Sequence, residues 1–106
     1  MTQALPRYAM HINGAEAEST SGEWFESFNP FTGRPWALVA RGDATDVDRA
    51  VQAAHTALKC EWGAITPSQR GALLRRLGDL IARDAERLTE IEVRDNGKLD
   101  TRNNRL

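Results

Sequence analysis

The segment Thr66-Pro67-Ser68-Gln69 carries the clearest helix start in the chain. Threonine favours the position before a helix, proline favours the first helical position, and glutamine at the third position can complete a capping box. Leucine and isoleucine then recur at three- and four-residue spacing, which predicts one apolar helix face. This apolar stripe consists of Leu73, Leu74, Leu77, Leu80 and Ile81. We expect the stripe to need a partner surface.

Another helix is predicted on the amino-terminal side of this one. Thr45 can cap it, and Asp48 three residues later completes a capping box. The apolar residues that follow keep the spacing of a single helix face, which is narrow because half of them are alanine. They are Val47, Ala50, Val51, Ala54, Ala57 and Leu58. Gly63 is expected to end this helix.

On the carboxyl-terminal side, the apolar stripe reaches Asp84, a residue poorly suited to a core position. One interpretation is a long helix with a polar interruption, and the other is two helices with Asp84 capping the second. We favour the break, because Asp84 and Glu86 also suit the electrostatics of a helix start. Leu88 and Ile91 continue the apolar face, and Gly97 supplies a stop.

The first forty residues have the pattern of strands and turns. Residues 8–12 form an apolar-rich run, and Asn13-Gly14 is the dipeptide that a type I′ hairpin turn favours. Trp24–Phe28 and residues 36–40 predict two further strands, joined by the turn Asn29-Pro30-Phe31-Thr32-Gly33. The expected fold is therefore α+β, a short antiparallel β-meander followed by three helices.

The composition is that of an ordinary soluble domain. Fourteen Lys and Arg against fifteen Asp and Glu give a net charge of −1, so no overall field attracts nucleic acid or membrane. Cys60 is the single cysteine, which excludes an internal disulfide and fits a reducing compartment. The sequence shows no signal-peptide core and no apolar run long enough to span a membrane. We expect a cytoplasmic protein.

Few residues suggest chemistry by themselves. Cys60 lies near Lys59, but a nucleophile also needs a base and an oxyanion site, so we interpret it as structural or incidental. His11 and His55 are far apart and lack ligand spacing for zinc. The sequence contains no glycine-rich phosphate-binding loop. We therefore nominate no catalytic and no cofactor-binding residue.

The arginines of the helical half raise the possibility of nucleic-acid binding. They are Arg70, Arg75, Arg76, Arg83 and Arg87. Acidic residues such as Asp79 and Glu90 are interleaved with them, whereas phosphate binding requires a stripe of one sign. We expect no nucleic-acid partner. The tryptophans Trp24, Trp36 and Trp62 are interpreted as packing anchors rather than as a ligand-binding box.

An ordered series of motifs runs along the chain. It comprises Ile12-Asn13-Gly14, Phe28-Asn29-Pro30-Phe31-Thr32-Gly33, Asp46-Val47-Asp48-Arg49-Ala50-Val51-Gln52-Ala53-Ala54, Trp62, Thr66-Pro67-Ser68-Gln69-Arg70 and Glu92-Val93-Arg94-Asp95-Asn96-Gly97-Lys98. In this order and spacing the chain resembles the amino-terminal segment of the NAD(P)-dependent aldehyde dehydrogenase superfamily. The resemblance implies that residues 8–98 belong to the cofactor-binding domain of an α/β fold. Residues 1–7 are then a flexible terminus and residues 99–106 a divergent tail.

The resemblance also implies a reaction, the NAD(P)-dependent oxidation of an aldehyde to a carboxylic acid. In the family the nucleophilic cysteine, the general base and the cofactor contacts lie beyond the point that corresponds to Leu106. We therefore expect this chain to be inactive alone and to bind no NAD or NADP by itself. A truncated gene, a frameshift and deliberate trimming would each explain the polar tail.

One site follows from the resemblance alone. Many family members hold a structural monovalent cation between the backbone before the Asn-Pro turn and the aspartate of the D-x-G-K segment. The corresponding positions here are Ser27, Phe28 and Asp95. Carbonyl and carboxylate oxygens are suitable ligands for a hard cation. The alternative is that Asp95 only shapes the helix end before Gly97.

Two expectations concern partners. Members of the family are homo-oligomers, and here the apolar stripe is a candidate surface for self-association. An alternative to a truncated aldehyde dehydrogenase is a small helical interaction module derived from that segment. Such a module would bind its partner through Leu77 and Leu80.

Overall fold

The structure is a computed structural model, and it describes residues 4–98. Five short strands precede the helices. They are β1 (Arg7–Tyr8), β2 (Met10–Ile12), β3 (Ala15–Ala17), β4 (Trp24–Phe28) and β5 (Pro35–Ala40). The helices are α1 (Ala44–Lys59), the four-residue α2 (Glu61–Ala64), α3 (Pro67–Arg83) and α4 (Ala85–Asn96). Strands followed by three long helices confirm the α+β expectation.

The strands form two small sheets rather than one meander. In the first sheet β5 is central, with β4 antiparallel on one side and β1 parallel on the other. The second sheet is the hairpin of β2 and β3. The apolar-rich run at residues 8–12 predicts one strand and gives no sign of the parallel pairing, whereas in the structure β1 ends at Tyr8. Pro6 already takes part in this pairing, since its carbonyl accepts a hydrogen bond from Leu38 N at 2.9 Å.

Both predicted turns are present. Asn13 and Gly14 have φ of 55° and 76°, the two positive values that a type I′ turn requires. In the turn between β4 and β5, Asn29 Oδ1 accepts a hydrogen bond from Phe31 N at 2.9 Å. Gly33 takes a φ of 69°, and its N–H donates to Asn29 O at 2.8 Å. These local contacts explain why the turns could be predicted from sequence.

The capping box of α1 lies two residues before the predicted one. Asp43 is the N-cap, and its side chain accepts a hydrogen bond from Asp46 N, while the Asp46 side chain accepts one from Asp43 N. Thr45 and Asp48 were therefore the wrong pair. Two aspartates can form a capping box as well as the expected threonine and aspartate can. The spacing of the residues therefore does not tell which of the two possible boxes starts the helix.

The end of α1 also differs from the prediction. The helix stops at Lys59, and Gly63 lies inside α2 instead of terminating α1. A Cβ at Gly63 would lie 1.6 Å from the carbonyl oxygen of Leu58. The glycine is therefore required by the close approach of α2 to the end of α1.

The second predicted helix start and the predicted break are confirmed. Thr66 and Gln69 form a reciprocal capping box with Pro67 in the first turn. Asp84 separates α3 from α4, but its side chain makes no capping hydrogen bond. It instead forms ion pairs with Arg83 at 3.1 Å and Arg87 at 3.5 Å. The hydrogen bond and charge of Arg83, together with the charge of Arg87, lower the pKa of Asp84.

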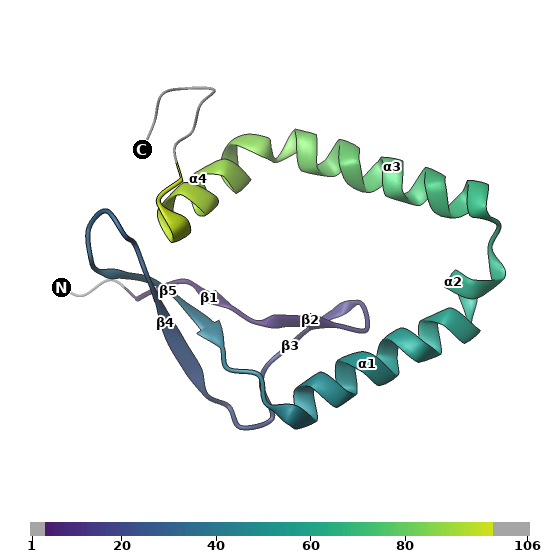
Figure 1. Cartoon of the computed structure of the whole chain (residues 1–106), viewed down its shortest axis with the longest axis horizontal. Coiled ribbons are helices and arrows are strands. Elements are labelled where there is room, and N and C mark those ends of the chain that lie inside the picture. Colours follow the sequence, from purple (N-terminus) through teal and green to yellow (C-terminus); the bar gives the residue numbers. More distant parts are fainter. Residues whose placement is uncertain (1–3, 99–106) are drawn as a thin grey trace.

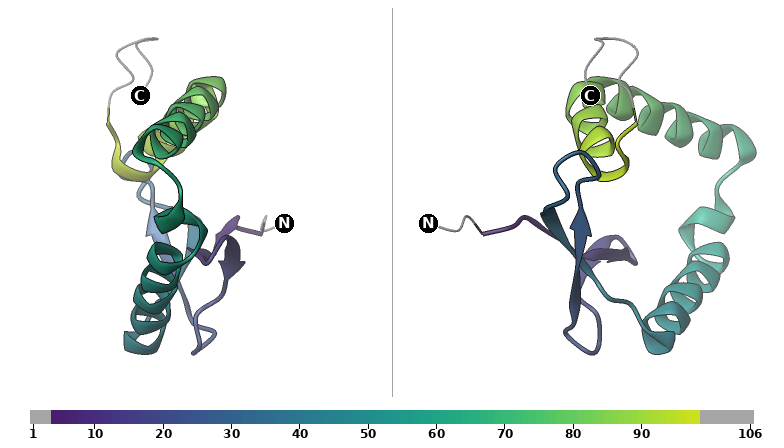
Figure 2. Two further views of the ribbon diagram at one scale, coloured as in Figure 1. Left: turned by 90° about the vertical axis from the view of Figure 1, so that its right-hand side faces the viewer. Right: turned by 60° about the vertical axis from the view of Figure 1, so that its left-hand side comes forward.

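The elements form a flat, open ring. Figure 1 shows α1 and α3 on two sides of it, joined by α2 at one end, while α4 returns toward β4 and β5 at the other. Figure 2 shows how thin the ring is, and its dimensions are 49 × 38 × 20 Å. The radius of gyration is 17.4 Å, against about 13 Å for a compact chain of this length.

The ring has almost no apolar core. Among residues 4–98, Ala37 and Ala40 are the buried apolar residues, and Ser19 and Asp46 are the buried polar ones. The chain exposes 8525 Å² of surface, whereas a compact protein of this mass would expose about 5,900 Å². Large apolar side chains on α1 and α3 are therefore left uncovered.

Candidate functional site

Asp95, in the last turn of α4, lies against the strands. Its Oδ1 accepts a hydrogen bond from the hydroxyl of Ser27 on β4 and another, at 3.1 Å, from the indole N–H of Trp36 on β5. The guanidinium carbon of Arg94 lies 5.6 Å from the centre of the Trp36 ring, a cation–π contact. These contacts connect α4 to the sheet formed by β4 and β5.

The helix end is shaped by glycine. Gly97 caps α4 with a φ of 73°, and its N–H donates to Val93 O at 2.9 Å. A Cβ at Gly97 would lie 3.2 Å from Cγ of Pro30 in the turn between β4 and β5. The predicted helix stop is therefore confirmed, and it also lets the end of α4 approach that turn closely.

The structure thus brings together two residues that were predicted as cation ligands, Ser27 and Asp95, although they are 68 positions apart. Phe28 follows Ser27, and the β-ladder is irregular between these two residues. The Phe28 side chain is a hydrocarbon, so only its backbone oxygen is a suitable ligand. Binding of a cation at Ser27, Phe28 and Asp95 stays a prediction.

Trp36 has two roles in this cluster, and the sequence predicts only one of them. It was interpreted as a packing anchor, and it does lie 5.8 Å from Tyr8, ring centre to ring centre. Its indole N–H also holds the Asp95 carboxylate. The ladder pairs Ser27 with Ala37 and Phe28 with Pro35, so Trp36 lies at the irregular step between them, beside the same carboxylate. That register could not be read from the pattern of residues alone.

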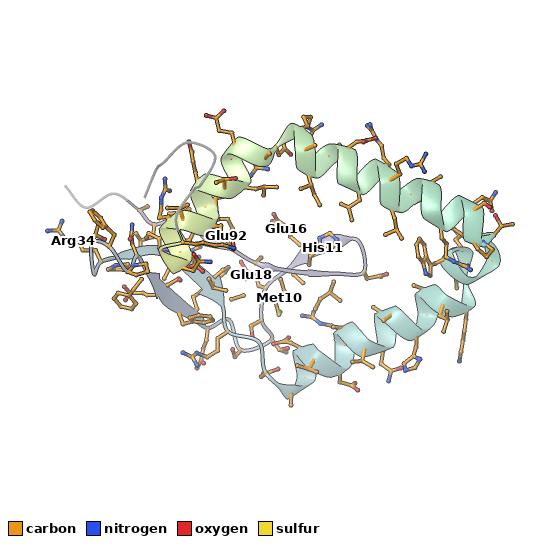
Figure 3. All side chains as sticks on the ribbon, turned by 45° about the horizontal axis from the view of Figure 1, so that its top comes forward. Met10, His11, Glu16, Glu18, Arg34 and Glu92 are labelled. Carbon is orange, nitrogen blue, oxygen red and sulfur yellow. The ribbon has the colours of Figure 1, made fainter. Side chains whose placement is uncertain are left out.

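An open groove of about 660 Å³ lies between the sheet and the helices α3 and α4. Its apolar wall is formed by Tyr8, Trp36, Val39, Ile81, Leu88 and Ile91. Its polar side is formed by Glu92, Asp95 and Asn96. Figure 3 labels Glu92 on α4 near the strands, whereas Arg34 lies at the outer end of the turn between β4 and β5. The groove is open and mainly apolar, which suits a packing partner better than a small polar ligand.

Asp46 is the most enclosed charged side chain of residues 4–98, at 1% exposed. Oδ2 accepts hydrogen bonds from Ser19 Oγ at 2.7 Å and from Asp43 N at 3.0 Å. Oδ1 accepts from Thr20 Oγ1 at 2.5 Å, from Thr20 N at 3.0 Å and from the Arg49 guanidinium at 3.1 Å. We call this cluster the Asp46 lock. It fastens the loop at Ser19 to the start of α1.

The contacts of the Asp46 lock favour the charged carboxylate. Hydrogen bonds from the Thr20 hydroxyl, the Asp43 N–H and the Ser19 hydroxyl hold the pKa of Asp46 far below its ordinary range. The sequence did not indicate the lock, because its two segments, the loop at Ser19 and the start of α1, come together only in the folded chain. A usable signal was the polar run Ser19-Thr20-Ser21, which supplies hydroxyl donors to a carboxylate.

The remaining candidates show no catalytic arrangement. Cys60 is an exposed free thiol at the junction of α1 and α2. Within residues 4–98, no group of three or more His, Cys, Asp and Glu side chains could hold a metal ion. Of the tryptophans, Trp24 lies under the Arg7 guanidinium at 5.1 Å, and Trp62 remains 40% exposed. None of the described helices is long and apolar enough to cross a membrane.

Comparisons with known proteins assign the chain to a family. The sequence pattern of the Aldehyde dehydrogenase family matches residues 16–104. An aldehyde dehydrogenase of Aspergillus niger is 43% identical over 89 residues, which are 84% of this chain and 18% of that protein. A probable aldehyde dehydrogenase of Mycobacterium bovis is 41% identical over 92 residues, 87% of this chain and 18% of that protein. The chain therefore spans less than a fifth of the length of these relatives.

Solved structures agree with the sequence comparison. A mutant aldehyde dehydrogenase of Bacillus cereus superposes with a TM-score of 0.83 at 37% identity, over 85% of this chain and 18% of that one. The NAD-dependent aldehyde dehydrogenase of Sinorhizobium meliloti superposes with a TM-score of 0.84 at 29% identity, over 90% of this chain and 19% of that one. These relatives give no support to a separate interaction module. By sequence and by backbone, the chain belongs to the aldehyde dehydrogenase family.

Proposed function

We propose that this chain forms the amino-terminal portion of the cofactor-binding domain of an NAD(P)-dependent aldehyde dehydrogenase. Residues 8–98 are that portion, and residues 99–106, which lie outside the described part of the chain, are a divergent tail. Of the terminus expected at residues 1–7, residues 1–3 also lie outside the described part, whereas Pro6 and Arg7 take part in the pairing with β5. The observation that carries the proposal is the backbone agreement, a TM-score of 0.83 with a relative whose chain it covers to 18%. In a complete enzyme the reaction is the oxidation of an aldehyde to a carboxylic acid with NAD or NADP.

We further propose that the chain alone neither binds NAD(P) nor oxidises aldehydes. The only thiol of the sequence, Cys60, is exposed at a helix junction rather than enclosed with a base and oxyanion donors. It directly precedes α2, a four-residue helix. Catalysis of hydride transfer requires the aldehyde, thiol and cofactor to be held together, and the described residues offer no such arrangement.

The test is an assay of the purified chain with a panel of aldehydes and both NAD⁺ and NADP⁺, following absorbance of the reduced cofactor. We expect no formation of NADH or NADPH, and no binding of either cofactor by calorimetry. A matched Cys60→Ala variant separates contaminants from true activity. Reduced cofactor formed by the chain and abolished in Cys60→Ala would refute the proposed inactivity, while leaving the family assignment intact.

The cluster at Asp95 supports the proposed structural cation. The β-ladder is irregular between Ser27 and Phe28, and the Ser27 hydroxyl donates to Asp95 Oδ1, so this part of β4 lies close to a carboxylate. One carboxylate oxygen, Oδ1, already accepts two hydrogen bonds, so Oδ2 and the backbone oxygens are the available ligands. All of them are hard oxygen donors, which fits Na⁺ or K⁺ better than a softer metal.

Thermal melts followed by circular dichroism test this cation site. Sodium and potassium chloride are compared with choline chloride at equal ionic strength. A cation at ten times its Kd should stabilise the folded chain by about 1.4 kcal/mol. Asp95→Asn should remove the cation dependence, whereas Asp79→Asn on α3 should keep it. Equal melting temperatures in all three salts would leave Asp95 as a helix-end residue only.

The expectations on location and partners are also proposals. A single cysteine and a net charge of −1 support a cytoplasmic protein that binds neither nucleic acid nor membrane. Two of the arginines, Arg83 and Arg87, are paired with Asp84, which reduces the positive charge available to phosphates. Homo-oligomerisation of a full-length protein would follow the family.

A further inference from the structure

The dipeptide Asn-Gly occurs twice in the chain, as Asn13-Gly14 and as Asn96-Gly97. In such a pair the peptide nitrogen of the glycine can attack the side-chain amide of the asparagine, because glycine has no side chain to obstruct the approach. Both asparagines are exposed to water. The two pairs share the same chemistry, so a difference in their reactivity reports on the fold around each of them.

The reaction needs only water and hydroxide as co-reactants. The glycine N–H loses its proton to hydroxide, and the nitrogen forms a bond to Cγ of the asparagine. The bond between Cγ and Nδ2 breaks, and the leaving nitrogen takes a proton from water and departs as ammonia. Water then opens the cyclic imide at either of its carbonyls, which gives aspartate or isoaspartate. Nothing is oxidised or reduced.

At Asn96 the reacting groups are held by hydrogen bonds. The attacking nitrogen would be that of Gly97, whose N–H donates to Val93 O at 2.9 Å. Asn96 Oδ1 accepts a hydrogen bond from Lys98 N at 2.7 Å, and Nδ2 donates to Glu92 Oε1 at 3.1 Å. Asn96 is also the last residue of α4. The helix end must therefore open before the nitrogen can approach Cγ.

At Asn13 the same groups have no such partners among residues 4–98. The residue lies at the tip of the β2–β3 hairpin (Figure 1), between Ile12 and Ala15 of the two strands. Neither its side chain nor the Gly14 N–H forms a hydrogen bond within the described part of the chain. A Cβ added at Gly14 would meet nothing within 4 Å, so the space around this residue is open.

The backbone around Asn13 is also easy to open. The strands β2 and β3 have three residues each and form a sheet of their own, separate from β1, β4 and β5. An isolated two-stranded hairpin is at best marginally stable in water. Local opening of such exposed backbone requires far less free energy than unfolding of the chain. The turn at Asn13, with its φ of 55°, can therefore relax until the Gly14 nitrogen reaches Cγ.

We propose that Asn13 is a site of spontaneous deamidation, with aspartate and isoaspartate as its products, and that the hydrogen bonds at the end of α4 protect Asn96. The remaining asparagine of residues 4–98, Asn29, precedes Pro30, which has no N–H and cannot attack in this way. The inference concerns the chemistry of the hairpin tip, so it does not depend on the proposed aldehyde dehydrogenase role.

The modification changes both the shape and the charge of the hairpin. Isoaspartate continues the chain through its side-chain carboxyl group, so it adds a backbone carbon to the turn. A two-residue turn fixes the register in which Ile12 pairs with Ala15, and a longer turn no longer matches it. Replacing the neutral amide with a carboxylate also changes the net charge of the chain from −1 to −2.

Ageing of the purified full chain in mildly alkaline buffer tests the proposal. Cleavage after glutamate yields a peptide that ends at Glu16 and has Asn13 as its only asparagine, and cleavage after lysine and arginine yields Asp95–Lys98, which contains Asn96. Mass spectrometry of the two peptides gives the rate of ammonia loss at each site. We expect Asn13 to react on the order of tenfold faster, because hydrogen bonds must first break at Asn96.

The same measurement in concentrated guanidinium chloride isolates the contribution of the fold. In the unfolded chain both asparagines are followed by an unhindered glycine, so the two rates should become similar. Equal rates in the folded chain, or faster reaction at Asn96, would overturn the proposal. A difference that persists unchanged in the denaturant would also overturn it, because the neighbouring residues and not the fold would then be the cause.

Two matched variants identify the source of the ammonia. Asn13→Ser should abolish the early release of ammonia from the aged chain, whereas Asn96→Ser should keep it. Circular dichroism shows that both variants retain their helix content, and the peptide measurement on the unchanged chain does not depend on either of them. Early release that continues in Asn13→Ser and disappears in Asn96→Ser would contradict the assignment of the reactive site.

Discussion

Asp46 and Leu77 lie on two helices of the same ring, yet their surroundings are opposite. The Asp46 carboxylate is 1% exposed, and both of its oxygens accept hydrogen bonds from the chain itself. Leu77 is 52% exposed on α3, and three of its neighbours in the apolar stripe are equally open. The chain satisfies its buried polar groups internally but leaves much of its large apolar surface uncovered.

The two regions differ because a carboxylate is stabilised by a few hydrogen-bond donors, whereas an apolar side chain is stabilised by burial against a surface. A carboxylate is satisfied by a few donors at the right distance, which a loop and a helix start can supply. Apolar stabilisation grows with the area removed from water, so it needs a broad opposing surface. A thin ring, only 20 Å across its short axis, does not offer that surface. The chain therefore supplies all the donors that the Asp46 lock needs, but it does not supply a surface that covers the apolar stripe.

The comparison predicts the largest loss of stability for Asp46→Ala. The change would leave the donors of Ser19, Thr20 and Asp43 without their acceptor, at a buried position. The melting temperature, followed by circular dichroism, should fall by on the order of 10 °C. Asp48→Ala, two positions later on the exposed side of α1, should leave it nearly unchanged. Equal effects of the two substitutions would mean that the lock adds nothing to an ordinary helix start.

Acid should open the same region first. An aspartate in an unfolded chain has a pKa of about 3.9, whereas the hydrogen bonds from Thr20, Asp43 and Ser19 hold the pKa of Asp46 far below it. The stabilisation is therefore complete above about pH 4 and is lost as the pH falls further, because the unfolded chain takes up the proton first. Melting temperatures at decreasing pH should fall less steeply in Asp46→Asn. A parallel fall in both proteins would show that another group controls the acid response.

A smaller effect separates the two possible capping boxes of α1. Removal of a true N-cap side chain costs about 1 kcal/mol. We therefore expect Asp43→Ala to lower the free energy of unfolding by that amount and Thr45→Ala to change it little, by urea titration. Asp43 is the residue whose side chain accepts the hydrogen bond from Asp46 N at 3.0 Å. The reverse result would restore the capping register that the sequence first suggested.

The smallest expected changes in the free energy of unfolding come from replacing two glycines, and the two changes should have opposite signs. Gly97→Ala should destabilise by about 1 kcal/mol because its φ of 73° is left-handed. Gly78 lies inside α3, and a Cβ there would meet nothing within 4 Å. Gly78→Ala should therefore stabilise by about 0.5–1 kcal/mol through helix propensity. Urea titration of both variants measures the difference, and the same sign for both would contradict the assigned backbone conformations.

Several local signals were reliable, although the cap expected at Thr45 and the stop expected at Gly63 were wrong. Asn13-Gly14, Thr66 with Gln69, and Gly97 each act through backbone contacts within a few residues, and each was predicted correctly. Asp84 was recognised as a break, but its side chain pairs with arginines rather than capping α4. Short-range chemistry thus predicted where elements begin and end more securely than which side chain would do the capping.

The candidate site was only partly accessible from the sequence. Ser27, Phe28 and Asp95 were nominated through resemblance, and the fold places Ser27 against Asp95. Trp36 joins them because β4 and β5 pair in one particular register. Strand register depends on which strands meet, and that choice is made by packing over the whole chain.

By itself, the sequence determined the strand–helix order, the helix stop at Gly97, the apolar stripe and the family, since periodicity, caps and motifs are all local properties of the chain. Only the tertiary structure decided that β1 pairs in parallel with β5, that Asp46 is enclosed, and that the stripe stays open. These outcomes depend on contacts between segments separated by tens of residues. Such contacts are set by the competition among all surfaces of the folded chain, which no single segment encodes.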